Sequence, residues 1–173
     1  MLIGNNKLSV APLTTHIDVK EVSKKINKKL IFNKIMTIQS WFKNRYKRMP
    51  KFGILGLNPH NAELRSNSEE RKVIIPSINL LKKRGINIHG PLISDTLFIK
   101  DYLKYDVIVG MYHDQIITPF KTIFKFNAIN ITLGLRYLRV SPDHGTAKNL
   151  IGKNKATAES LINCINFISK SKK

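Results

Sequence analysis

Four of the five histidines stand in polar segments that directly follow apolar runs. They are His16 in Thr-Thr-His, His60 in Asn-Pro-His, His113 in Tyr-His-Asp-Gln and His144 in Asp-His-Gly-Thr, whereas His89 lacks such a setting. Neutral imidazole is the commonest metal ligand, and side chains at the ends of different strands can converge in an α/β fold. The pattern is compatible with a metal site, but the wide separations match no local ligand signature, and ordinary loop hydrogen bonds are the simpler interpretation of the residues alone.

The elements that would position these histidines alternate between strands and helices. Short apolar runs at 52–57, 106–111, 128–133 and 137–140 predict buried strands, and 86–88 resumes an extended pattern. Helical spacing predicts a helical region around residues 18–47, in which 19–26 forms a separate short helix. It also predicts helices at 69–84, 114–124 and 156–170. The clearest spacing is that of Ile31, Ile35, Ile38 and Phe42, which share one helix face.

This alternation predicts an α/β layered fold with a largely parallel sheet, which binds ligands at the carboxyl ends of its strands. No internal repeat, low-complexity segment or flexible linker divides the chain, so residues 1–173 are expected to form a single α/β unit.

Composition favours a folded protein, because 42% of the residues are hydrophobic. The one cysteine, Cys164, has no partner for an internal disulfide and is expected in the core. No run approaches the ~20 apolar residues that span a bilayer, and the first residues lack a signal peptide's apolar stretch. The expected compartment is the cytoplasm.

The net charge of +19, from 30 Lys and Arg against 11 Asp and Glu, raises nucleic-acid binding as an alternative. The cations are mostly lysines scattered among asparagines and isoleucines, without an arginine-rich stripe interleaved with aromatics. The densest basic stretch, residues 43–51, falls at the end of a predicted helix, where cations complement the helix dipole. A solvated basic surface is the favoured interpretation.

Five segments carry a resemblance to a known family. They are Gly-Leu-Asn-Pro-His at 56–60, Gly-Pro-Leu-x-x-Asp-Thr-Leu-Phe at 90–98, Met-Tyr-His-Asp-Gln at 111–115, Asn-Ile-Thr-Leu-Gly-Leu at 130–135 and Ser-Pro-Asp-His-Gly-Thr-Ala at 141–147. In residue identity and order they resemble the 4-hydroxythreonine-4-phosphate dehydrogenase family. The resemblance covers essentially the whole of this chain, but only the second half of the family's sequence. The resemblance implies a three-layer α/β/α fold of the isocitrate/isopropylmalate dehydrogenase type that lacks its amino-terminal half.

The resemblance also implies site residues. The family's three metal-binding histidines, at a site between two subunits, correspond to His16, His60 and His113. Its substrate-binding positions correspond to Lys121, Asn130 and Arg139, whose side chains suit a phosphorylated amino acid. Asp143 and His144 belong to a motif near the family's active site, and their role as partner of a ligand or in proton transfer stays open.

The implied activity is the NAD- or NADP-dependent oxidation and decarboxylation of 4-phosphohydroxy-L-threonine to 3-amino-2-oxopropyl phosphate, in pyridoxine and pyridoxal phosphate biosynthesis. One divalent ion, zinc, magnesium, manganese or cobalt, would assist both steps. The implied partners are a second copy of the chain, forming a homodimer, and a separately encoded amino-terminal half.

Three departures from the family pattern bear on activity. Residues 61–67 replace a glycine-rich stretch, Ile116 replaces a glycine, and residues 122–126 lack the family's glycine. Side chains disfavour positive φ, so an altered loop after His60 is predicted. A degenerate, non-catalytic remnant is therefore the main alternative to an enzyme component.

Overall fold

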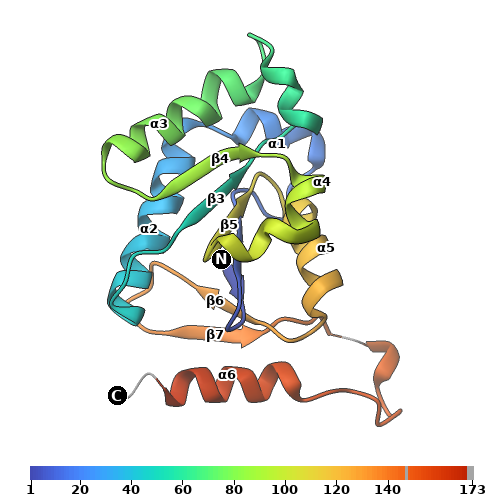
Figure 1. Ribbon diagram of the computed structural model, residues 1–173. Helices are drawn as coiled ribbons and strands as arrows, with labels where there is room; N and C mark the ends of the chain where they lie inside the picture. The colour runs from blue at the N-terminus through green and yellow to red at the C-terminus, as the bar shows by residue number, and fades with distance from the viewer. Residues whose placement is uncertain (147, 171–173) are drawn as a thin grey trace.

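The structure, a computed structural model, describes residues 1–146 and 148–170. Its strands are β1 (Leu2–Gly4), β2 (Ser9–Pro12), β3 (Phe52–Leu55), β4 (Ile88–Leu92), β5 (Val107–Gly110), β6 (Ile129–Thr132) and β7 (Arg139–Pro142). They form one sheet in the order β4-β3-β5-β2-β1-β6-β7 (Figure 1). Strands β4, β3, β5 and β2 are parallel, whereas β1 is antiparallel to β2 and β6, and β7 is antiparallel to β6. The predicted α/β fold is confirmed.

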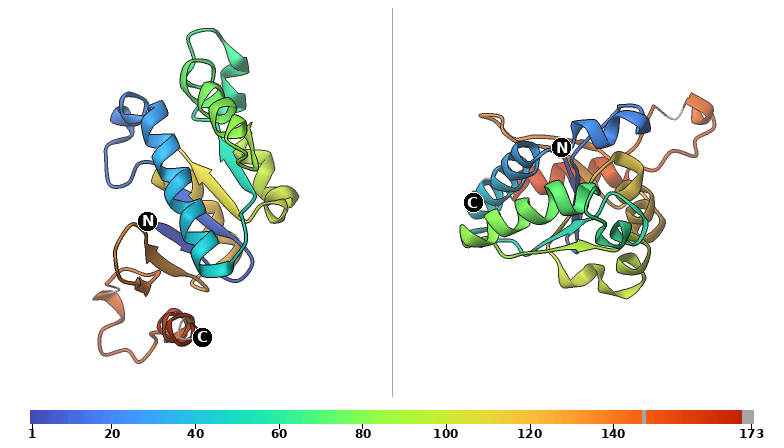
Figure 2. Two further views of the ribbon diagram at one scale, coloured as in Figure 1. Left: turned by 90° about the vertical axis from the view of Figure 1, so that its left-hand side faces the viewer. Right: turned by 90° about the horizontal axis from the view of Figure 1, so that it is seen from above.

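Helices cover both faces of this sheet. They are α1 (Val19–Lys25), α2 (Lys28–Tyr46), α3 (Ile75–Lys83), α4 (Ser94–Thr96), α5 (His113–Phe124) and α6 (Glu159–Ser169). A π-helical turn, Glu70–Ile74, leads into α3, and another, Leu97–Asp101, follows α4. Helices α1 to α3 pack on one face and α5 on the other, which gives three layers (Figure 2).

The helix spacings in the sequence identified the residues that form the core. Ile31, Ile35, Ile38 and Phe42 of α2 are all buried against the sheet, as predicted. Helix α2 begins at the cap Asn27, whose side chain accepts a hydrogen bond from the backbone N–H of Leu30 at 2.9 Å. It ends after Tyr46, so the basic stretch at 43–51 lies at the carboxyl end of a helix, as predicted.

The amino-terminal strands were not predicted. Both β1 and β2 are short and are joined by a tight turn in which Asn5 accepts hydrogen bonds from the backbone of Lys7 and Leu8. The last strand was placed at 137–140, but it occupies Arg139–Pro142, and Tyr137 is exposed. Turn residues in both places interrupt the apolar pattern that sequence reasoning follows.

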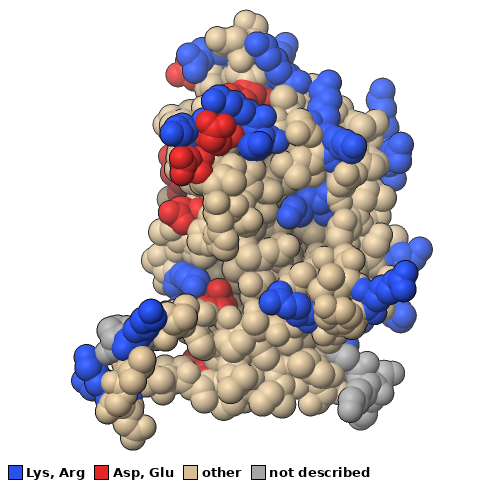
Figure 3. Space-filling model, turned by 180° about the vertical axis from the view of Figure 1, so that it is seen from behind, with Lys and Arg blue, Asp and Glu red and all other residues tan. Residues whose placement is uncertain are grey.

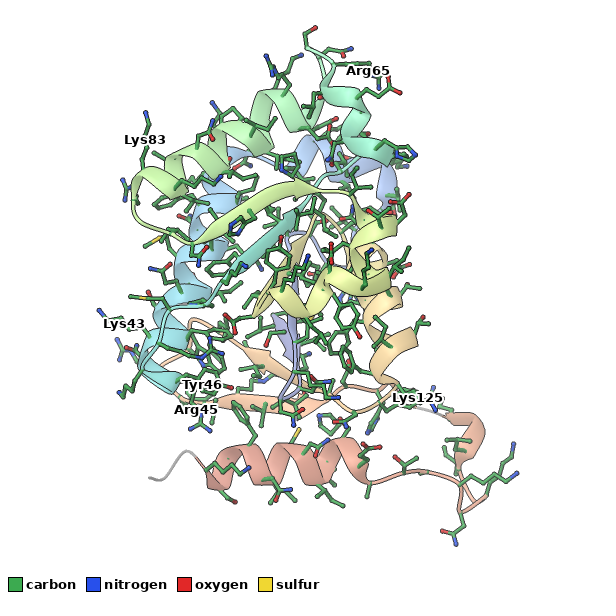
Figure 4. All side chains as sticks on the ribbon, viewed as in Figure 1. Lys43, Arg45, Tyr46, Arg65, Lys83 and Lys125 are labelled. Carbon is green, nitrogen blue, oxygen red and sulfur yellow. The ribbon has the colours of Figure 1, made fainter. Side chains whose placement is uncertain are left out.

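Helix α6 packs on β6 and β7 with its less apolar face (Figure 1). Ser160 and Cys164 are buried, which confirms the core position of the cysteine, whereas Leu161 and Ile165 are 50% and 56% exposed. The apolar stripe that predicted this helix thus points to solvent. Arg45, at the end of α2, donates a hydrogen bond from Nη2 to the carbonyl oxygen of Phe167 at 2.9 Å, which ties α2 to α6 (Figure 4).

Lysines and arginines lie over several elements of the face seen in Figure 3, and acidic residues lie among them in its upper part. Within residues 1–146 and 148–170, none of the helices combines the length and the hydrophobicity needed to cross a bilayer.

Candidate metal and substrate site

The three candidate metal ligands follow three neighbouring parallel strands. His16 comes after β2, His60 after β3 and His113 directly after β5, and these strands are adjacent in the sheet. Parallel strands place their carboxyl ends at one edge, where α/β proteins bind ligands. The Thr14 hydroxyl donates to the carbonyl oxygen of Met111 at 2.8 Å, which joins two of the three strand ends.

His16 and His113 lie beside each other at this edge, with ring centroids 5.9 Å apart. Both line a cavity of about 200 Å³, together with Thr14, Tyr112 and Asp114 among others. Because an imidazole nitrogen binds a metal ion at about 2.0–2.1 Å, two rings on one ion have centroids roughly 5–6 Å apart. The spacing and chemistry of this pair therefore fit a divalent ion.

Asp114 orients the ring of His113. Its Oδ1 lies 2.7 Å from Nδ1 of His113, so Nδ1 carries the proton that is shared with the carboxylate. The other ring nitrogen, Nε2, then keeps the lone pair that a metal ion needs.

Replacing Asp114 with Asn is expected to weaken divalent-metal binding about tenfold, because the amide no longer fixes the ring tautomer as a carboxylate does. Titration of the purified protein with Zn²⁺ or Mn²⁺ against a competing chelator measures this change. Asp95→Asn, in α4, is the matched control and should leave the affinity unchanged. Equal affinities for wild type and Asp114→Asn would contradict the orienting role.

His60 is not part of the same cluster. Among the described residues, no group of three or more His, Cys, Asp and Glu side chains is arranged to hold a metal ion. His60 is exposed and opens a left-handed turn in which five consecutive residues without a glycine, 60–64, have φ between 48° and 56°. Positive φ at residues other than glycine costs about 1–2 kcal/mol for each residue.

The strand end before His60 is held by a buried carboxylate. Glu70 is 0% exposed, and its Oε1 accepts hydrogen bonds from the backbone N–H groups of Leu57 and Asn58, both at 2.8 Å. The Asn58 side-chain amide donates to Oε2 at 3.0 Å. Burial raises the pKa of Glu70, but these hydrogen bonds outweigh burial and hold the pKa below its usual value.

Lys121, a candidate substrate-binding residue, is held by Asp143. Its Nζ donates to the backbone oxygen of Asp143 at 3.1 Å and lies 3.4 Å from Oδ1. Burial raises the pKa of the Asp143 carboxyl, and the charges of Lys121, His144 and His113 oppose the rise. The candidate residue Lys121 is thus held at Asp143, whose carboxyl also feels the charges of His144 and His113.

Asn130 and Arg139 lie on the adjacent strands β6 and β7. Nη1 of Arg139 donates to the Thr132 hydroxyl at 2.7 Å, and these two residues are opposite each other in the register. Asn130, two residues from Thr132, lies on the same side of the sheet, and its Oδ1 is buried with no hydrogen-bond partner among the described residues. His144 is exposed, and Ala147, which closes its motif, lies outside the described residues.

Ser160 links α6 to this site. Its hydroxyl donates to the carbonyl oxygen of Ala128 at 2.6 Å and accepts from the backbone N–H of Asp143 at 2.8 Å.

Ser160→Ala is expected to lower the free energy of unfolding by about 2 kcal/mol, because two buried backbone groups lose their partner. Urea unfolding measures this loss. Ser169→Ala, an exposed serine of the same helix, should change stability by less than about 0.5 kcal/mol.

Sequence reasoning missed three buried or part-buried residues of this region: Glu70, Gln115 and Ser160. Gln115 belongs to the Met-Tyr-His-Asp-Gln segment, so the motif was a signal for it. Glu70 and Ser160 act on backbone groups of residues 12 or more positions away, and no local spacing marks such contacts.

The fold matches about half of each of several solved α/β dehydrogenases. A solved 4-hydroxythreonine-4-phosphate dehydrogenase from Klebsiella pneumoniae superimposes with a TM-score of 0.83 at 29% identity, over 99% of this chain and 53% of that one. The corresponding enzyme structure from Burkholderia phymatum gives 0.75 at 34% identity, over 98% and 52%.

The family's sequence model, described as pyridoxal phosphate biosynthetic protein PdxA, matches residues 1–168, and the chain belongs to this family. A relative from Sulfurihydrogenibium, named 4-hydroxythreonine-4-phosphate dehydrogenase, is 42% identical over 95% of this chain and 52% of its own length. A relative of the same name from Wigglesworthia glossinidia brevipalpis is 39% identical over 96% and 51%. The chain spans about half the length of these curated relatives.

Proposed function

We propose that this chain is the metal-binding part of an NAD(P)-dependent dehydrogenase that converts 4-phosphohydroxy-L-threonine to 3-amino-2-oxopropyl phosphate and carbon dioxide, in pyridoxal phosphate synthesis in the cytoplasm. The observation that carries the proposal is the His16–His113 pair at the carboxyl ends of adjacent parallel strands, with the candidate substrate residue Lys121 on the same helix, α5, as His113. Family membership supports it, because the named relatives are dehydrogenases for this substrate.

Within this proposal, His16, His60 and His113 hold one zinc, magnesium, manganese or cobalt ion. A bound ion would supply Lewis-acid polarisation of the substrate oxygen, and bound NAD or NADP would supply the hydride acceptor. The Lys121 ammonium and the Arg139 guanidinium bind the anionic phosphate and carboxylate groups, and Asn130 orients the substrate with its amide. Asp143 keeps Lys121 in place through its backbone oxygen and its carboxylate.

The third histidine is proposed to come from a second copy of the chain. Among the described residues, one copy brings His16 and His113 into a shared cavity, whereas His60 is exposed and belongs to no group of three possible ligands. A homodimer in which the His60 turn of one copy approaches the histidine pair of the other would complete the site. Zinc sites that act in catalysis commonly use three protein ligands and keep one position open.

The activity is tested by co-expressing this chain with the remaining half of a full-length relative, such as that from Sulfurihydrogenibium. The purified pair, supplied with 4-phosphohydroxy-L-threonine and a divalent ion, is expected to reduce NAD or NADP, and the same pair with His113→Ala should not. A stable pair without activity would contradict the enzyme and favour a degenerate, non-catalytic remnant.

A further inference from the structure

Gln115 joins the ends of the two strands that precede His60 and His113. Its Nε2 donates to the carbonyl oxygen of Gly56 at 2.7 Å, and its Oε1 accepts from the backbone N–H of Met111 at 2.7 Å. Both partners are main-chain atoms, so the tie depends on the position of the strands and not on other side chains.

The two partners occupy equivalent positions in the sheet. The last paired residues of β3 and β5 are Ile54 and Val109, and Gly56 and Met111 each lie two residues further along. A primary amide has a donor and an acceptor, as a peptide group has. The Gln115 amide therefore supplies the hydrogen bonds between the segments that follow β3 and β5, at positions where the two backbones no longer pair directly.

The space for this amide is provided by glycine. A Cβ on Gly110 would come within 3.2 Å of Oε1 of Gln115 and within 3.0 Å of Ile116, which is tighter than side chains normally pack. On the far side of Gly56, Glu70 holds the backbone N–H groups of Leu57 and Asn58. Residues 56–58 are thus fixed from both sides, two residues before His60.

We propose that Gln115 is a positioning residue that sets the His60 turn relative to the His16–His113 pair. This consequence for metal binding rests on the proposed function. In a symmetric dimer, the His60 turn of each copy would meet the histidine pair of the other copy, and the two contacts would be identical. The distance between the turn and the pair within one copy would therefore also set where the third ligand meets the partner's pair. Partners of metal ligands commonly change affinity by 10- to 100-fold when they are removed.

The test compares wild type, Gln115→Met and Gln115→Glu in the 173-residue chain. Methionine loses both hydrogen bonds at similar size, whereas glutamate keeps the acceptor for Met111 but has no donor for Gly56. Both variants are expected to bind Zn²⁺ about tenfold more weakly. Gln39→Met, on a partly buried position of α2, is the matched control and should bind as wild type does. Thermal unfolding identifies any variant that fails to fold.

A second readout needs no metal. The ring signals of His60 in NMR spectra of metal-free protein are expected to be single in wild type and broadened or doubled in both Gln115 variants. If wild type binds no metal but the variants disturb the His60 signals, the proposed function fails and the positioning role stands. Unchanged His60 signals in folded Gln115→Met, or wild-type affinity in a protein that does bind Zn²⁺, would overturn the role.

Discussion

Replacing His113 with alanine is expected to weaken divalent-metal binding about 100-fold. Structural zinc sites bind with about 10–16 kcal/mol shared among four ligands, which is roughly 3 kcal/mol, or roughly 100-fold, for each ligand. His113 is half of the only imidazole pair that the described residues bring within 6 Å of ring-centroid distance. Isothermal titration with Zn²⁺ measures the effect.

His89→Ala is the matched control, because His89 stands exposed on β4 and its ring contacts Tyr105. It should bind metal as wild type does. Affinity that is equal in wild type and His113→Ala would remove the basis for the metal site.

Mixing two defective variants separates a shared site from a site within one chain. His60→Ala keeps the His16–His113 pair, and His113→Ala keeps the His60 turn. In a mixed dimer, one of the two sites would regain all three imidazoles, so tight binding is expected to return at about half the sites of the mixed dimers. No recovery in a mixture shown to exchange subunits would contradict a site shared between two copies.

The sequence alone predicted an α/β fold and the strands that precede His60 and His113, but not β2, the strand that precedes His16. Spacing such as that of Ile31, Ile35 and Ile38 identifies a buried helix face, because helical periodicity depends only on residues that are close in the sequence. Strand order and direction depend on contacts between distant segments. Nothing near Leu2–Gly4 indicates that this strand lies in the middle of the sheet, between β2 and β6.

The family resemblance proposed His16, His60 and His113 as candidate ligands and gave no geometry for them. Only the fold shows that His16 is the neighbour of His113 and that His60 is not grouped with them. The turn at 60–64 has positive φ values although none of its residues is a glycine. Local preference is overruled there by surrounding contacts, including the hydrogen bond from Asn61 Nδ2 to the Pro91 oxygen at 3.0 Å.

Glu70→Ala is expected to lower the free energy of unfolding by about 3 kcal/mol or more, the largest stability effect of the substitutions considered. The backbone N–H groups of Leu57 and Asn58 would be left without their buried acceptor, and each unsatisfied buried donor costs about 1–3 kcal/mol. Urea unfolding at neutral pH measures the loss. Glu69→Ala is the matched control, because Glu69 is less buried and accepts a single hydrogen bond, from the Asn58 side chain.

The stabilisation that Glu70 gives to the folded protein should also decrease as the pH is lowered. Its pKa is lower in the folded protein than in the unfolded chain, where it is about 4.3. The carboxylate therefore contributes its full stability above about pH 5, and the contribution falls as the pH drops through the folded-state pKa. The difference in unfolding free energy between wild type and Glu70→Ala should shrink below about pH 4, whereas that for Glu69→Ala should change little. A difference that stays constant from pH 7 to pH 3 would mean that the charge of Glu70 does not hold the His60 strand end.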